Sequence, residues 1–178
     1  MEYLMKKTII ATLITLTLIV GVIYANTEES TLPNLSMPDN NLSFQNIEGY
    51  QDYKIVATHF RTDKKELRYI LANSIGYNAL KEKAKVMPEG SKIVKIGWSV
   101  QEMPLFPSAL EADKIQRVEY MVKDSIKFNA NGDNWGYARF VKKDGVYKAW
   151  DKGTQGCIAC HSSAKKQDFL FTGLQGKF

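Results

Sequence analysis

Two cysteines and a histidine near the C-terminus form the pattern in this chain with the clearest chemistry. Cys157 and Cys160 are separated by two residues, and His161 follows directly. Two thiols at this spacing can add to the two vinyl groups on one edge of a porphyrin, and the next residue then supplies an imidazole as axial ligand of the iron. The pattern predicts one covalent haem c, attached through Cys157 and Cys160 and ligated by His161.

Other uses of these thiols fit the sequence less well. The chain has two cysteines and two histidines, and three of those four residues lie in this one motif. A structural zinc site needs a second pair of ligands, and no other cysteine is present. A thioredoxin-like pair is expected near the start of a domain, and a disulfide across two residues is strained. Haem attachment is therefore the favoured interpretation.

The N-terminus predicts export. Lys6 and Lys7 precede an uncharged, mostly apolar segment over residues 8–24, and Ala25 follows as a small residue at a plausible cleavage point. Residues 1–25 are thus expected to be a signal peptide or an uncleaved N-terminal membrane anchor, with membrane contact only through residues 8–24. Either one places the domain in a bacterial periplasm, soluble or tethered to the inner membrane, where haem attachment takes place.

The rest of the chain has the size of one domain. Residues 26–49 are rich in Asn, Ser and Pro without apolar periodicity, so they predict a flexible tether, and residues 50–178 are expected to form the haem-binding domain. The 24 Lys and Arg against 19 Asp and Glu give a net charge of +5, but the lysines are dispersed along the sequence. This pattern indicates a solvated surface and does not predict nucleic-acid binding.

Alternating apolar residues predict a sheet. Period-two patterns occur at residues 92–98, 117–123 and 135–141, with a further strand candidate at 53–60 and a turn at 143–145 that leads into Val146. Residues 66–72 fit a helix or a strand; we interpret them as a strand, followed by a helix over residues 74–85 capped by Asn73. The expected fold class is α+β, a mainly antiparallel β-sheet with a few helices and a C-terminal haem site. The four amphipathic helices of a haem-binding bundle are not predicted.

The strand at residues 92–98 has two interpretations. Alternation places Ile93, Lys95 and Gly97 on one face and the larger apolar residues on the other. The first face is then either solvated, which the pattern alone slightly favours, or faces the haem, with Gly97 letting a flat macrocycle approach closely.

An ordered set of segments carries a resemblance to a known family. These segments are E-L-R-Y-I-L around Arg68, P-E-G-S-K-I-V-K ending at Lys95, V-K-D-S-I-K-F from Val122, N-W-G-Y-A-R-F from Asn134, C-I-A-C-H from Cys157 and A-K-K-Q-D-F-L-F-T from Ala164. Over most of residues 50–175 the chain resembles the cytochrome P-460 and cytochrome c′-beta family. The resemblance implies a homodimer and a five-coordinate, high-spin haem with His161 as its proximal ligand.

The resemblance also implies function. Members oxidise hydroxylamine, coupled to nitric oxide chemistry, or bind nitric oxide and other small gases, and the oxidising members exchange electrons with a redox partner protein. Catalytic members join a lysine to the porphyrin, and Lys95 matches that position, so the resemblance favours a haem-facing Lys95. Arg68 matches an arginine of the distal pocket, and Asp151 is the nearest candidate for the pocket carboxylate that accepts protons.

Two alternatives to catalysis stay open. A gas-binding member caps the iron with phenylalanine, for which Phe60 and Phe106 are candidates, although both also suit a core. A low-spin electron carrier needs a sixth ligand, and His59 is the candidate, although such a histidine is more often hydrogen-bonded at the surface. Met87, Met103 and Met121 could also ligate the iron, but methionine more often fills core gaps.

Overall fold

The structure is a computed structural model that describes residues 32–176. The segment expected to be a signal peptide or membrane anchor, residues 1–25, lies outside the described residues. Within residues 32–176, no helix is long and apolar enough to cross a membrane.

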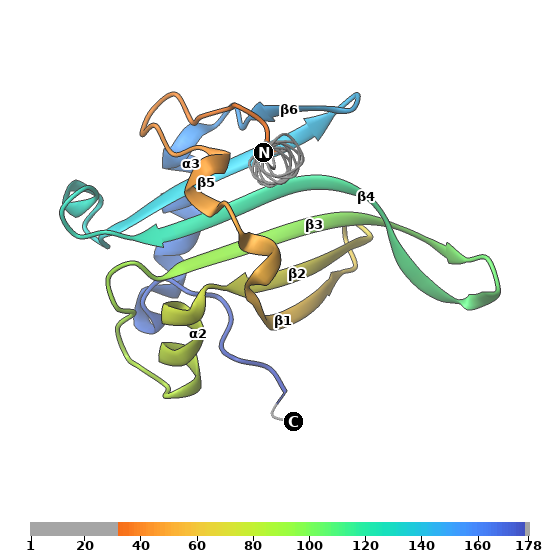
Figure 1. Ribbon diagram of the computed structural model, residues 1–178, viewed down its shortest axis with the longest axis horizontal. Helices are drawn as coiled ribbons and strands as arrows, with labels where there is room; N and C mark the ends of the chain where they lie inside the picture. The colour runs from red at the N-terminus through yellow and green to blue at the C-terminus, as the bar shows by residue number, and fades with distance from the viewer. Residues whose placement is uncertain (1–31, 177–178) are drawn as a thin grey trace, which may run out of the picture. The chain divides into compact units, whose positions relative to one another are not determined.

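One antiparallel sheet of six strands forms the centre of the domain, and its spatial order follows the chain (Figure 1). The strands are β1 (Lys54–Arg61), β2 (Glu66–Ala72), β3 (Lys92–Met103), β4 (Phe106–Lys123), β5 (Trp135–Lys143) and β6 (Val146–Ala149). Two short α-helices, α2 (Ser74–Lys81) and α3 (Gly153–His161), and four 3₁₀ turns, η1 (Phe44–Ile47), η2 (Tyr50–Asp52), η3 (Asn129–Asn131) and η4 (Ser162–Gln167), complete the described chain. The predicted α+β fold with a mainly antiparallel sheet is confirmed.

Helix α2 begins where the sequence predicts and ends earlier. The Asn73 side chain accepts a hydrogen bond from the Gly76 backbone N–H at 3.0 Å, so it caps the first turn. The helix ends at Lys81 instead of residue 85. Lys83 has a φ of 57°, a left-handed conformation that a right-handed helix cannot continue through.

Strands β3 and β4 extend beyond the sheet as a long hairpin (Figure 1). The sequence predicts only residues 92–98 and 117–123 of these strands. The remainder pairs with itself, Val100 opposite Ala112 and Met103 opposite Phe106, with register shifts between Gly97 and Met103. These shifts break the period-two pattern, so alternation could not reveal this part.

The expected tether over residues 26–49 is wrong for residues 32–49. Four side chains of this segment are buried against one face of the sheet, and they are Met37, Leu42, Phe44 and Ile47. Phe44 stacks on Phe140 of β5 with ring centroids 4.4 Å apart. The folded domain therefore begins before Tyr50, because these apolar residues cover the sheet although their spacing follows no regular period.

The same N-terminal segment also holds the start of helix α3. The Asp39 carboxylate accepts hydrogen bonds from the Thr154 backbone N–H at 2.5 Å and from the Thr154 hydroxyl at 2.8 Å. A Cβ at Gly153, whose φ is +58°, would lie 2.7 Å from the Asp39 carboxylate. Glycine is thus required for this approach, and a distant aspartate caps the helix that carries the CxxCH motif.

Candidate haem site

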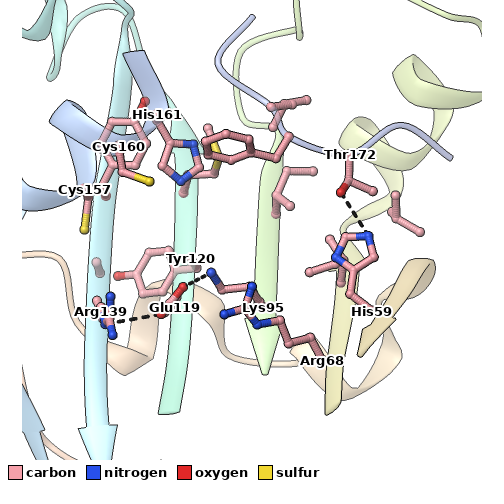
Figure 2. A pocket seen from close by; sticks show the side chains of 18 of the residues that line it. His59, Arg68, Lys95, Glu119, Tyr120, Arg139, Cys157, Cys160, His161 and Thr172 are labelled. Carbon is pink, nitrogen blue, oxygen red and sulfur yellow. Dashed lines mark hydrogen bonds and ion pairs between the residues drawn. The ribbon is translucent and has the colours of Figure 1, made fainter. Parts of the chain in front are cut away.

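A cavity of about 360 Å³ lies on the sheet face opposite the N-terminal segment. Its lining brings together residues from both ends of the domain: Arg68 of β2, Lys95 of β3, and Cys157, Cys160 and His161 of α3. Figure 2 shows His161 and the two cysteines on one side of this cavity, with Lys95 and Arg68 opposite them. Five of the six site residues predicted from the sequence therefore share one cavity.

The cysteines and the histidine lie on one face of α3. Cys157, Cys160 and His161 have the i, i+3, i+4 spacing that aligns side chains along a helix. Cys157 is partly buried and Cys160 is exposed, and neither is in a disulfide within residues 32–176. Burial, followed by the nearby Glu119 charge, raises the pKa of the Cys157 thiol to about 11. Both sulfurs are thus available to a group that fills the cavity.

His161 is held with one ring nitrogen free to face the cavity. Its Nδ1 is 2.7 Å from the Phe169 carbonyl oxygen, so the Nδ1–H donates a hydrogen bond to that oxygen and Nε2 is the basic nitrogen. The rings of Tyr137 and Phe171 each lie 5.0 Å from the imidazole, centroid to centroid. Burial lowers the pKa of His161 and outweighs the opposing effect of the Phe169 hydrogen bond, so the imidazole is neutral. A neutral imidazole with an anchored Nδ1 is the form that binds a metal.

The remaining lining suits a flat, largely apolar group. Apolar side chains from the sheet, from α2 and from the C-terminal segment contribute to the cavity, and they are Val56, Ile70, Leu80, Ile93, Met121, Leu170 and Phe171. Together with two thiols and one free imidazole nitrogen, these residues match what a haem c requires. The residues present therefore fit the haem that the CxxCH motif predicts.

The wall opposite His161 is charged. Lys95, Glu119 and Arg139 are direct neighbours across β3, β4 and β5, and all three line the cavity (Figure 2). Lys95 Nζ forms an ion pair with Glu119, and Nε of Arg139 lies 3.2 Å from the same carboxylate. Burial acts to raise the pKa of Glu119, but the charges of Lys95, Arg139 and Arg117 outweigh it and hold the pKa below its usual value. Glu119 is thus an ionised carboxylate inside the cavity.

Glu66 is a second carboxylate next to this charged wall. Glu66, 5% exposed, accepts hydrogen bonds from Arg68 and Arg117. A Cβ at Gly97 would lie 3.0 Å from the Glu66 carboxyl carbon and 3.2 Å from Cγ of Arg117. The prediction that Gly97 admits the macrocycle is therefore wrong: the space above Gly97 is filled by this ion-pair cluster.

Asp151 is not the pocket carboxylate. It is exposed in the turn before α3 and is not among the residues that line the cavity. The cavity carboxylate is Glu119, which the sequence reasoning missed. Alternation on β4 held a signal, because Glu119 lies on the face opposite the buried Val118 and Tyr120, but a charge on that face was also consistent with solvent exposure.

Other candidate iron ligands and caps are placed as follows. His59 lines the cavity, and its Nε2 lies 3.2 Å from the Thr172 hydroxyl (Figure 2). Burial, Arg68 and Lys95 together lower the pKa of His59. Phe60 and Phe106 are 47% and 60% exposed and lie outside the cavity, so neither acts as the predicted cap.

The comparisons with known proteins agree with this geometry. A family model described as Cytochrome P460 matches residues 47–172, which is most of the chain and includes the strands, the charged wall and the CxxCH motif. The comparison with curated proteins finds no match. A β-rich domain whose C-terminal helix presents two cysteines and a histidine to a cavity, together with this match, shows that the chain belongs to the cytochrome P460 family and is a haem c cytochrome.

Proposed function

We propose that this protein is an exported mono-haem cytochrome with an open iron position that oxidises a small nitrogen substrate such as hydroxylamine. The observation that carries the proposal is the Lys95–Glu119 ion pair on the cavity wall opposite His161. Gas binding alone needs an open position and no base. A charged wall with an ionised carboxylate supports catalysis instead.

The position of each site residue in the cavity indicates its role. Cys157 and Cys160 would hold the haem, and His161 would bind its iron, with the Phe169 carbonyl orienting the imidazole. When bound, the haem supplies an iron that accepts electrons from substrate and passes them to a redox partner protein. Lys95 and Arg68, across the cavity from His161, would then face the substrate.

Glu119 is the proposed proton acceptor, in place of Asp151. Oxidation of hydroxylamine releases protons, and a general base must lie beside the reacting atoms. In the ion pair with Lys95 the carboxylate is a weak base, because the neighbouring cations hold its pKa low. Joining the Lys95 nitrogen to a porphyrin carbon would replace one N–H and one C–H bond, with two electrons passing to an external two-electron oxidant, and the linked nitrogen would no longer carry the ammonium charge. The pKa of Glu119 would then rise, because the charge and the hydrogen bond of Lys95 are its largest lowering influences, while Arg139 and Arg117 would still lower it.

The proposed link between Lys95 and the porphyrin is tested directly by peptide mass spectrometry of the mature holoprotein. We expect one haem peptide that contains Lys95 together with Cys157 and Cys160. A haem peptide with the two cysteines alone, alongside an unmodified Lys95 peptide, favours the gas-binding members of the family over the catalytic ones.

The activity is tested with purified holoprotein, hydroxylamine and an artificial electron acceptor. We expect Glu119→Gln to lower turnover by about 10²–10⁴-fold, the usual contribution of a positioned general base. The matched control Asp151→Asn should keep full turnover. Equal turnover in the wild type and Glu119→Gln, with haem retained in both, would remove Glu119 from the mechanism, and absence of turnover in the wild type would reject the catalytic proposal.

A second candidate function is a low-spin electron carrier, and His59 favours it. This histidine lines the same cavity as His161. As an iron ligand, it would have to exchange its Thr172 contact for the metal. The reduced optical spectrum separates the two functions: we expect broad high-spin bands that change with carbon monoxide, whereas a sharp low-spin α-band would favour the carrier.

We also propose a homodimer, which the family resemblance implies. The tip of the β3–β4 hairpin supports it, because its apolar side chains are exposed: Leu105 by 98%, Phe106 by 60% and Leu110 by 55%. Such a patch is a common feature of protein interfaces. Light scattering of the holoprotein should give twice the chain mass, and Leu105→Lys together with Phe106→Lys should give the monomer.

A further inference from the structure

A buried ion pair lies behind His161 and has no part in the chemistry proposed above. Lys123, the last residue of β4, is only 4% exposed. Its Nζ lies 2.8 Å from Oδ1 and 3.1 Å from Oδ2 of Asp168, and it donates a hydrogen bond to the Asp133 carbonyl at 3.0 Å. Removing two charges from water costs several kcal/mol per ion, so a buried pair often stabilises a fold no more than apolar residues do. The pair does, however, fix the geometry of the groups around Asp168.

Asp168 is fixed through both its side chain and its backbone. Its carboxylate also accepts a hydrogen bond from the Met87 backbone N–H at 2.7 Å, and its carbonyl accepts one from Trp135 Nε1 at 3.1 Å. Asp168 and Phe169 have φ angles of 48° and 64°, so two consecutive non-glycine residues are left-handed. Such a turn is strained and persists only where surrounding contacts hold it.

This turn directs a carbonyl at the proximal histidine. Phe169 follows Asp168 in the chain, and its carbonyl oxygen lies 2.7 Å from Nδ1 of His161. A hydrogen bond at Nδ1 sets the orientation of a metal-binding imidazole and increases the electron density that its other nitrogen gives to the metal.

A second chain of contacts connects Lys123 to the imidazole of His161. The Asp133 carbonyl accepts a hydrogen bond from Lys123, and the Asp133 carboxylate accepts one from the Tyr137 hydroxyl at 2.6 Å. The Tyr137 ring packs against His161 with centroids 5.0 Å apart. The Lys123 ammonium group thus supports two contacts of His161. It acts through Asp168 on the Phe169 carbonyl and through Asp133 on the Tyr137 ring.

We propose that Lys123 and Asp168 are positioning residues for the haem iron, acting through the Phe169 carbonyl on His161. This inference rests on the proposed ligation of the iron by His161. Loss of the ion pair lets the strained turn relax and weakens the hydrogen bond at Nδ1. The imidazole then donates less charge, which destabilises the ferric state relative to the ferrous state.

The test uses holoprotein carrying Lys123→Met or Asp168→Asn. Lys123→Met removes the charge but keeps most of the apolar stem, and Asp168→Asn keeps the shape and the acceptor for Met87. Resonance Raman spectroscopy of the reduced protein reports the iron–histidine stretch, and redox titration reports the midpoint potential. We expect a lower stretching frequency and a higher potential in both variants.

Lys92→Met is the matched control. Lys92 lies on the neighbouring strand at the same end of the sheet, and its Nζ donates to the Asn46 carbonyl at 2.6 Å, away from His161. The control should leave both readouts at their wild-type values. If Lys123→Met and Asp168→Asn lose stability but keep the wild-type frequency and potential, the pair is structural only and the inference is overturned. A wild-type protein that shows no iron–histidine stretch would instead show that the iron is not five-coordinate with His161 as its ligand, which would refute the proposed function itself.

Discussion

The two faces of the central sheet use neighbouring residues of the same three strands for opposite purposes. On one face Val94, Tyr120 and Ala138 are paired across β3, β4 and β5, and all three are buried in an apolar core. One residue along, Lys95 and its cross-strand neighbours Glu119 and Arg139 form a charged wall on a cavity.

The difference shows how a small domain can contain a cluster of partly buried charges and still be stable. The apolar face with Val94, Tyr120 and Ala138, here the closed face, supplies the burial that stabilises the strands, and the N-terminal segment covers it. The face with Lys95, Glu119 and Arg139, which carries the cavity, is the open face. The open face can then hold ion pairs whose contribution to stability is small or negative. Substitutions on the two faces should therefore separate stability from haem chemistry.

The largest effect on stability is expected from the closed face. Phe140→Ala removes a fully buried ring stacked on Phe44, and it should lower the free energy of unfolding by about 4 kcal/mol. Denaturant titration measures the loss, and the optical spectrum of the folded fraction should match the wild type. Val146→Ala, at a side chain that is 60% exposed, serves as the control. A changed haem spectrum with unchanged stability would contradict the division between the faces.

A slightly smaller effect is expected at the edge of the open face. Glu66→Gln leaves Arg68 and Arg117 without their shared carboxylate, which should cost about 3 kcal/mol at neutral pH. The arginines hold the pKa of Glu66 below its usual value, although burial acts to raise it. A lowered pKa stabilises the fold above the unfolded-state pKa, and this contribution is lost as the pH falls through the folded-state pKa.

The pH dependence therefore provides a sharper test of the same substitution. The stability difference between wild type and Glu66→Gln should be largest near pH 7 and should shrink below about pH 4, where the unfolded carboxyl takes up its proton. The exposed Asp63, paired with Arg61, offers the matched control Asp63→Asn, which should leave the stability curve unchanged. A constant difference from pH 7 to pH 3 would show that the ion pairs do not carry the effect.

A third prediction concerns the contact that joins the two faces. Asp39→Ala removes the carboxylate that caps α3 and should cost about 1–2 kcal/mol, as lost helix caps do. Amide hydrogen exchange should become faster at Thr154 and along α3, while the buried strands keep their protection. Asp52→Ala, in η2 of the same N-terminal region, is the control substitution, and equal exchange in both variants would argue against capping by Asp39.

The smallest effect is expected at His59. Because the iron position opposite His161 is proposed to be open, His59→Ala should leave the ferric and reduced optical spectra almost unchanged. The lowered pKa makes His59 neutral at pH 7, so charge loss adds no further change. Conversion of a low-spin ferric spectrum to a high-spin one would show that His59 binds the iron.

Local patterns in the sequence predicted much of the fold and five residues that line the candidate haem cavity. Strand β2, most of β5, and residues 92–98 of β3 and 117–123 of β4 follow from alternation, and Asn73 marks the start of α2. The CxxCH motif identifies the haem-binding helix because covalent attachment needs that spacing. These features depend on residues close together in the chain.

The features that were missed depend on partners far apart in the chain. Residues 32–49 have the composition of a tether, and only the sheet surface makes Met37 and Phe44 a core. Glu119 becomes a pocket carboxylate because β3 and β4 pair with Lys95 opposite it, a register that neither segment reveals alone. The missing side chain at Gly97 leaves room for the side chains of Glu66 and Arg117, not for a macrocycle.

The link between Asp39 and Thr154 has a consequence for the order of events during biogenesis. Its two ends are separated by 115 residues, so the N-terminal end of the haem-binding helix acquires its cap only after almost the whole chain has been made. Contacts of such high sequence separation form late in folding, because the loop between them must first be closed. The two thiols therefore remain on an unfinished helix while the rest of the sheet assembles. Both cysteines would then stay accessible for the proposed attachment of a haem until this contact forms.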